Sequence, residues 1–409
     1  MIVLYILLAL LVFGIMILVH ELGHFLVARA CHVTVNEFSI GMGPKLISWI
    51  GKRKKNGEKR DAAADSAKDS AITENSAGET VSIGTPAQTT ENAGEQSALA
   101  ETAGNTTAPE QLNPDEGTRY SLRLLPIGGY VSMAGEDEDS NDPDAFNHKN
   151  VWQRIAITVA GGLMNIVLGF LATLLLVGLT GNFLNTTVRG FYRDEGNTPT
   201  ASESFLQVND KILSVNGKKM HNFTEIAYEI MYNGYEPVNM VVERNGEKVR
   251  LDGVQFAVQE EKDVKFGVVD FGTYNEKKTP WTLLKNGFYS TVSQIRMLWE
   301  TLIDLLKGRF GFNAVSGPVG VVGAIGQTAK AGFSNLLSLF AFITLNLGVF
   351  NLLPIPALDG GRLVFLLIEA VSRKKVPAKV EATIHGVGMI VLLAFMFVVS
   401  VKDVIMMFL

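Results

Sequence analysis

Residues 1–30 read MIVLYILLALLVFGIMILVHELGHFLVARA, and this stretch decides the fold class of the chain. Met1 to Val19 carry no charged side chain, and the apolar run resumes at Phe25 after a short polar cluster. A helix rises about 1.5 Å per residue, so this stretch is long enough to cross a bilayer core of about 30 Å. No basic region precedes the apolar run, as one would in a cleaved signal peptide. We therefore expect a first transmembrane helix over residues 1–30.

Three later apolar segments are predicted by the same reasoning. They are a second transmembrane helix at 151–180, a third segment at 333–371 that breaks at Pro354 and Pro356, and a fourth helix at 386–409. The composition agrees, because 47% of the 409 residues are hydrophobic and only 19% are charged. The expected fold is a multi-pass α-helical membrane protein with about four transmembrane helices.

Composition also excludes several classes of function. The single cysteine, Cys31, rules out an internal disulfide and a cysteine-rich zinc or iron–sulfur site. The formal net charge of -5 argues against a nucleic-acid partner. The expected partners are therefore membrane lipid and other membrane proteins.

Basic residues predict how the spans are oriented. Lysines and arginines gather in two connections, at 52–60 and at 373–379. Connections rich in these residues stay in the cytoplasm. Four spans then place both termini and the region 180–330 outside a cell membrane, meaning the plasma or inner membrane.

The connection at 31–150 is predicted to be β-rich and to carry an insert. Residues 61–114 contain no aromatic residue and are rich in Ala, Ser, Thr and Glu, so they predict a disordered acidic insert. The flanking stretches 33–41 and 120–131 alternate partly with period two and predict strands that pair into a small membrane-associated hairpin or sheet. Whether the insert is only tolerated or acts as a regulatory or docking segment stays open.

Two further segments follow the second predicted span. Residues 187–272 contain short β-rich pieces, turn pairs such as Asn216-Gly217 and one helical piece, which together predict a small inserted α+β domain. Residues 281–306 repeat apolar residues at three- or four-residue spacing. This spacing predicts an amphipathic helix that lies on the outer membrane surface or against the bundle.

A polar cluster interrupts the first span with the pattern His20-Glu21-Leu22-Gly23-His24. Positions i and i+4 share one face of a helix, so both imidazoles can bind one metal ion. Glu21 lies beside them and can take a proton from the attacking water. Ionisable groups are expensive within a membrane and indicate function there, although polar packing inside a bundle is the alternative.

Two histidines leave a tetrahedral metal site in need of another protein ligand. His221 falls in the predicted outer domain, while His148 and His385 are not near a membrane break. Asp359 follows the third span directly. It lies 23 residues after Leu336, and His20 lies 19 residues after Met1, so both fall in the cytoplasmic half of the membrane. The alternative role for Asp359 is to cap the helix that follows it.

The chain resembles the site-2 proteases, the intramembrane zinc metalloproteases, and in particular the bacterial type with one PDZ domain. The resemblance covers nearly the whole chain outside the insert, and five motifs carry it in order. They are His20–His24, Phe38–Gly41, Pro126–Val131, Ser316–Gly320, and Asn346 with the stretch Asn351–Gly361.

The resemblance implies a role for each site residue. His20, His24 and Asp359 are expected to bind Zn²⁺, and Glu21 is expected to act as the general base. Asn346 and Asn351 are expected to contact the substrate near the scissile bond.

The stretch 206–217 resembles part of a PDZ domain, so the α+β domain at 187–272 is expected to be PDZ-like. Asn209 departs from the family by standing where a Gly-Asp turn is usual, which puts peptide binding in doubt. Gly162 stands where the family often has proline, and we expect this change to alter only local helix packing.

The resemblance also implies the substrates, which are single-span membrane proteins cut in regulated intramembrane proteolysis, such as anti-sigma factors or signal-peptide remnants. Two classes compete with this interpretation. A non-enzymatic scaffold would use the PDZ-like domain to bind partners, and a metal transporter would line a path with ligands on both sides of the midplane. A site of two histidines and one carboxylate can also hold iron, but the adjacent Glu21 favours hydrolysis.

Overall fold

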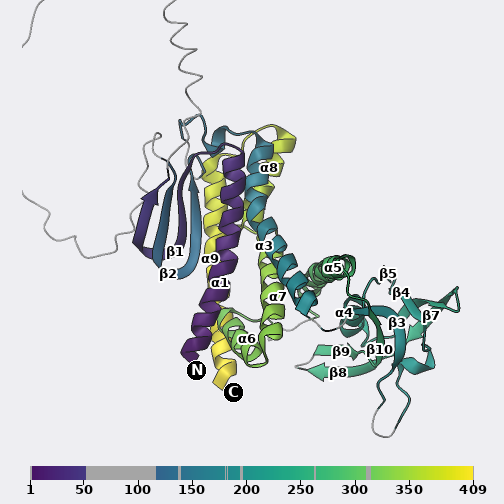
Figure 1. Cartoon of the computed structure of the whole chain (residues 1–409). Coiled ribbons are helices and arrows are strands. Elements are labelled where there is room, and N and C mark those ends of the chain that lie inside the picture. The colour runs from purple at the N-terminus through teal and green to yellow at the C-terminus, as the bar shows by residue number, and fades with distance from the viewer. Residues whose placement is uncertain are drawn as a thin grey trace, which may run out of the picture.

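A computed structural model of the chain describes residues 2–51, 117–136, 140–179, 181, 183–193, 197–261, 264–309 and 315–408. The predicted insert at 61–114 lies outside the described residues, as do the basic residues at 52–60. Figure 1 shows two parts, a long helical bundle and a smaller α+β module (residues 183–276) that meets the bundle through α5 (Pro280–Leu306).

Among the described residues, four helices are long and apolar enough to cross a membrane, as predicted. The candidate spans, Val3–Ala30, Val151–Leu179, Phe333–Asn351 and Lys379–Met406, lie in α1 (Ile2–Ala30), α3 (Val151–Leu179), α7 (Phe333–Asn351) and α9 (Ala378–Phe408). Two shorter helices complete the bundle, α6 (Pro318–Lys330) and α8 (Asp359–Ser372). Helix α9 begins eight residues before the predicted start at 386, directly after Pro377, because the polar residues before the apolar run also form helix.

Glycines bring the backbones of α1, α3 and α7 into contact. A Cβ atom at Gly23 would lie 2.5 Å from the carbonyl oxygen of Ala160, and one at Gly348 would lie 2.8 Å from the carbonyl oxygen of Gly162. Such small residues allow close approach in lipid, where packing rather than the hydrophobic effect holds helices together. Gly162 therefore lies in the contact between α3 and α7.

A small sheet covers one side of the bundle beside α1. It consists of the long strands β1 (Val35–Ile50) and β2 (Arg119–Met133), which fold back on each other. Residues 35–40 pair antiparallel with 129–133, and 47–50 pair with 119–122. A buried cluster that includes Phe25, Phe38 and Met133 joins the sheet to α1.

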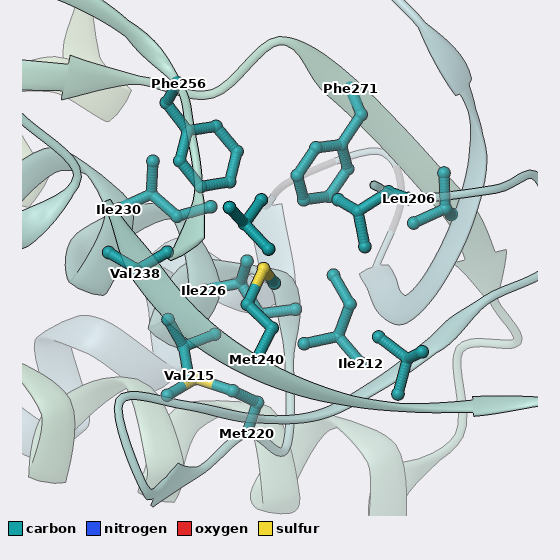
Figure 2. Packing of buried hydrophobic residues seen from close by; sticks show 13 residues of the cluster. Leu206, Ile212, Val215, Met220, Ile226, Ile230, Val238, Met240, Phe256 and Phe271 are labelled. Atoms are coloured by element: carbon teal, nitrogen blue, oxygen red, sulfur yellow. The ribbon is translucent and has the colours of Figure 1, made fainter. Parts of the chain in front are cut away.

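The α+β module is a twisted sheet with one helix. The strands lie in the order β10-β3-β4-β6-β7, with β5 beside β4, and β8 and β9 form a separate hairpin. Their bounds are β3 Phe183–Phe191, β4 Lys211–Val215, β5 Lys218–Lys219, β6 Val238–Arg244, β7 Glu247–Val254, β8 Ala257–Glu261, β9 Val264–Val268 and β10 Phe271–Glu276. Ile226 and Ile230 of α4 (Phe223–Asn233) pack with the sheet residues Ile212, Met240 and Phe271 in an apolar core (Figure 2).

Asn209, the departure from the usual Gly-Asp turn, takes up the backbone conformation that glycine favours. Its φ is +74°, and its side chain accepts a hydrogen bond of 3.0 Å from the Tyr274 hydroxyl. Asparagine tolerates the left-handed region better than most residues do. The turn is therefore formed without glycine.

Helix α5 joins the module to the bundle and does not stand alone. On the module side, the ring of Tyr289 stacks on His221 at 3.7 Å, and Glu300 pairs with Lys218 at 2.5 Å. On the bundle side, Leu298 packs in a buried cluster with Leu345 of α7. Of the two predicted positions for this amphipathic helix, the structure shows the one against the bundle.

Candidate metal centre

His20 and His24 lie one turn apart on α1 and face the same way. Their side chains are only 10% and 12% exposed, and their rings meet edge to face with centroids 4.8 Å apart. The Nε2 atoms of the two rings are 3.2 Å apart. The spacing of four residues along a helix thus places two ring nitrogens side by side.

Asp359 reaches the same point from the first turn of α8. Leu358, not Asp359, is the residue that caps this helix, so the capping alternative is wrong. The Oδ2 atom of Asp359 lies 3.1 Å from Nε2 of His20 and 3.3 Å from Nε2 of His24. Residues that are more than 330 positions apart in the sequence therefore form one cluster of three possible ligand atoms.

The cluster has the dimensions of a zinc site. The three donor atoms form a triangle with sides of 3.1, 3.2 and 3.3 Å. Nitrogen and oxygen ligands bind Zn²⁺ at about 2.0–2.1 Å, so neighbouring donors of a tetrahedral site are about 3.3–3.4 Å apart. These three residues fit a zinc ion and leave a fourth position for water or substrate.

Helix α3 forms the wall behind the histidines, and it needs a glycine there. A Cβ atom at Gly161 would lie 2.2 Å from Nε2 of His24 and 2.7 Å from Cε1 of His20. On the same helix, the carbonyl oxygen of Ile157 lies 2.8 Å from Nδ1 of His24. That contact orients the ring, because a histidine that binds metal through Nε2 donates from Nδ1.

Two asparagine side chains face Nδ1 of His20. The Nδ2 atom of Asn165 on α3 lies 3.3 Å from it, and that of Asn351 at the end of α7 lies 3.4 Å from it. Asn346 is half-buried on α7, and neither it nor Asn351 lines the cavity in front of the ligands. The structure thus brings Asn351 to the metal centre but gives Asn346 no contact with it.

A cavity of about 230 Å³ opens in front of the ligands. Glu21 lines it beside the two histidines and Asp359, and strand β2 contributes Tyr130, Val131 and Met133. Glu136 and Arg362 form another part of the wall and are joined by an ion pair of 2.5 Å. The Glu381 carboxylate of α9 lies 3.4 Å from the same arginine.

Tyr130 is fixed in this wall by its neighbours on the sheet. Arg123 donates a hydrogen bond of 2.7 Å to its hydroxyl and a second one of 3.2 Å to the Glu37 carboxylate. Burial and the hydrogen bond with Glu37 raise the pKa of Tyr130 to about 12. The hydroxyl is therefore protonated and neutral at every physiological pH.

One of the other histidines lies closer to the centre than expected. His221 is in the α+β module, and His148 lies against the Asp142 carbonyl. His385 of α9, however, accepts a hydrogen bond of 3.1 Å from the backbone N–H of Ala357, two residues before Asp359. The prediction that His385 is not near the membrane break is wrong. Ala357 and His385 are 28 positions apart in the sequence, and no local pattern indicates that α9 contacts this turn.

The turn before Asp359 is tightly folded and strained. Ala357 has a φ of +77°, in the left-handed region that costs residues other than glycine free energy. A Cβ atom at Gly360 would lie 2.0 Å from the carbonyl oxygen of Leu353. Gly360 therefore lets the chain turn closely enough to bring the carboxylate of Asp359 to the histidines.

A family model and several relatives all match this chain to the same family of metalloproteases. The family described as Peptidase family M50 matches residues 8–56 and 111–395. A putative zinc metalloprotease of Clostridium acetobutylicum is 31% identical over 400 residues, covering 98% of this chain and 97% of the relative. The regulator of sigma-W protease RasP of Bacillus subtilis is 32% identical, with 96% of both chains covered. The probable protease eep of Enterococcus faecalis is 31% identical, covering 96% of this chain and 97% of the relative.

Proposed function

Because the chain belongs to peptidase family M50 and is a zinc metalloprotease of the site-2 type, we propose that it cuts single-span membrane proteins within or next to their transmembrane segments. The observation that carries this proposal is the triangle of ligand atoms from His20, His24 and Asp359, formed partly within an apolar helix. A soluble substrate would have no need for ligands buried at this depth.

We assign the chemistry to residues at the centre. His20, His24 and Asp359 would hold the zinc ion, which supplies a Lewis acid for the scissile carbonyl. Glu21 takes a proton from the attacking water and passes it to the amide nitrogen as the C–N bond breaks. The products are a new carboxylate and a new amine. Asn351, and by resemblance Asn346, would hold the substrate beside the scissile bond.

The substrate must be partly unwound, since a helix hides its amides in internal hydrogen bonds. Residues 129–133 of β2 can receive such a segment. Among the described residues they pair only with 35–40, so the other edge of this strand is open. Tyr130 and Val131 of the same strand line the cavity, and a Cβ at Gly129 would lie 3.6 Å from Cγ of Glu21. A substrate added at this edge would pass the base and the ligands.

The proposed orientation places the metal centre toward the cytoplasm and the α+β module outside. Figure 1 supports it, because the end of α1 that carries the histidines and the module lie at opposite ends of the bundle. Lys149, Arg373 and Lys375 gather at the end that holds the metal centre, as the positive-inside rule requires.

The name of one relative and the fold of the module support a proposal for the substrates and for the function of the module. The name of the Bacillus subtilis relative refers to regulation of sigma-W. We infer anti-sigma factors or signal-peptide remnants as the substrate class of this chain. The PDZ-like module would then act as a filter, excluding proteins whose outer domains have not been removed.

The test separates metal binding from catalysis. Glu21→Gln should keep one zinc per chain but lower cleavage of a single-span test substrate by about 10²–10⁴-fold, since it removes only the base. His20→Ala and Asp359→Ala should lose both zinc and cleavage. Glu260→Gln, an exposed glutamate of β8, is the matched control and should behave as the wild type does.

Three results would contradict the proposal. Full cleavage by the Glu21→Gln protein would exclude Glu21 as the base. Zinc retained by the His20→Ala protein would exclude the ligand set. Uptake of metal into vesicles by wild-type protein that cuts no substrate would favour a transporter. A wild-type protein that neither cuts substrate nor takes up metal would favour a scaffold.

A further inference from the structure

The two metal-binding histidines have different partners on their second nitrogen. A histidine that binds a metal through Nε2 carries its proton on Nδ1, and this N–H needs an acceptor to hold the ring in place. His24 has a fixed acceptor in the carbonyl oxygen of Ile157, at 2.8 Å. In the part of the chain that the structure describes, His20 has no backbone carbonyl in that position, and the groups facing its Nδ1 are side-chain amides.

Asn165 is the amide with an unused acceptor. It is fully buried, with an exposed fraction of 0%, and its Nδ2 atom faces Nδ1 of His20 at 3.3 Å. Its Oδ1 atom is also buried and has no hydrogen-bond partner among the described residues. Rotating the amide by half a turn would exchange these two atoms and bring the buried oxygen to the histidine.

We propose that Asn165 is a positioning residue of the metal centre, whose amide oxygen accepts the hydrogen bond from Nδ1–H of His20. This inference rests on the proposed assignment of His20 as a ligand. An amide suits the position because it offers a donor or an acceptor, and so matches either tautomer of the imidazole. The buried oxygen then gains the partner that it otherwise lacks.

Asn165 fits this role better than Asn351, the other amide. Asn351 is half-buried at the C-terminal end of α7, beside the turn that leads to Asp359, where the substrate is expected to bind. Asn165 lies in the middle of α3, eight residues or about two turns after Ile157, with Gly161 between them. One helix thus supplies the close backbone contact for the two histidines and an acceptor for each.

The experiment measures zinc affinity by competition with a chelator, in purified protein and without substrate. Asn165→Leu keeps the approximate size but removes the acceptor, and it should weaken zinc binding by about 10–100-fold. Asn165→Asp keeps an acceptor and should bind zinc within a few-fold of wild type. Thr173→Val, which removes a buried hydroxyl from the same helix away from the site, should change nothing.

A second readout reports on the ring itself. The absorption spectrum of the cobalt-substituted protein depends on ligand geometry, so it should change in Asn165→Leu but not in Asn165→Asp or Thr173→Val. If Asn165→Leu fails to fold, Asn165→Asp decides, because folded Asn165→Asp protein that has lost zinc affinity would overturn the proposal.

The failure of this inference can be told from the failure of the proposed function. Wild-type affinity and spectrum in Asn165→Leu, with zinc lost in His20→Ala, would refute the role of Asn165 alone. Zinc retained in His20→Ala would refute the ligand assignment and this inference with it.

Discussion

The core of the α+β module and the metal centre of the helical bundle are packed in different ways. The cluster of side chains between α4 and the sheet of the module is apolar (Figure 2), and buried polar groups of the module such as Glu225 and Asp270 hydrogen-bond to residues outside that cluster. Around the metal centre, helices α1, α3 and α7 touch backbone to backbone at glycines, and the buried groups include His20, Arg154 and Asn165. In the apolar core of the module side chains supply the contact, whereas next to the metal centre the lack of a side chain permits it.

The difference follows from the surroundings of the two parts. The module gains stability by removing apolar surface from water, so each buried methylene contributes. Helices in lipid gain little in that way and depend on close packing and on satisfied polar groups. Removing atoms should therefore damage the module, and adding atoms should damage the metal centre.

The largest expected effect comes from adding one methyl group at the metal centre. Gly161→Ala would place a Cβ 2.2 Å from the donor nitrogen of His24 and should lower zinc affinity by at least about 100-fold, abolishing cleavage. Gly178→Ala is the control on the same helix, because its Cβ would lie 3.7 Å from Leu283 in ordinary contact. Zinc content and cleavage are measured for both, and equal values would show that α3 can move away from the histidines.

The next effect comes from removing atoms in the module. Ile226→Ala empties part of a fully buried core and should lower the free energy of unfolding of the module by about 2–5 kcal/mol. Zinc content should stay at the wild-type value, since no described residue of the module lines the metal cavity. Urea-dependent proteolysis of the module and metal analysis check the two halves of this prediction. Loss of zinc would mean that the two parts fold as one unit.

Removing the module altogether tests whether cleavage depends on it, and we expect a smaller effect than those above. Replacing residues 187–272 by a flexible linker should leave cleavage of an already trimmed substrate within a few-fold, because linkers add little free energy. It should increase cleavage of a substrate with a folded outer domain. Both substrates are compared in membranes at matched enzyme levels. A shortened enzyme that binds zinc but cuts neither substrate would show that the module, through α5, is needed for catalysis.

The smallest effect on stability is expected at the strained turn that precedes Asp359. Ala357→Gly relieves the left-handed φ of +77°, so it should stabilise the chain by at most about 1 kcal/mol and leave zinc affinity unchanged. The thermal unfolding temperature is the measurement, with Ala331→Gly, at the end of α6, as the control that should lower it. A lower temperature for Ala357→Gly would show that the greater conformational freedom of glycine in the unfolded chain outweighs the relief of strain.

The sequence predicts the features that repeat over short distances. Uncharged runs predict the four spans, and the four-residue spacing of His20 and His24 predicts two donors on one helix face. Asp359 follows from its depth in the membrane and from the family resemblance, since nothing nearby in the sequence ties it to α1. The same resemblance implied zinc and the protease family, and the family comparisons confirm both.

The residues that were missed act across large distances in the sequence. Gly161 and Asn165 are small or polar residues of the kind that suits close helix packing in lipid. Nothing along α3, however, indicates that they pack against His20 and His24 in particular. His385 contacts a turn 28 residues earlier in the chain. Each requires knowledge of which helices touch, which depends on packing across the whole bundle.

The hydrogen bond from Ala357 to His385 has a consequence for how the protein is made. During synthesis His20 and Glu21 are added early, and Asp359 is added only near the end of the 409 residues. Helix α9, which follows, supplies His385 to the strained turn and Glu381 to Arg362. A chain that ends after α8 carries all three proposed ligands and the proposed base, yet lacks the contacts that α9 makes beside Asp359. We therefore expect a half-made or truncated chain to be inert toward the neighbouring proteins of its membrane.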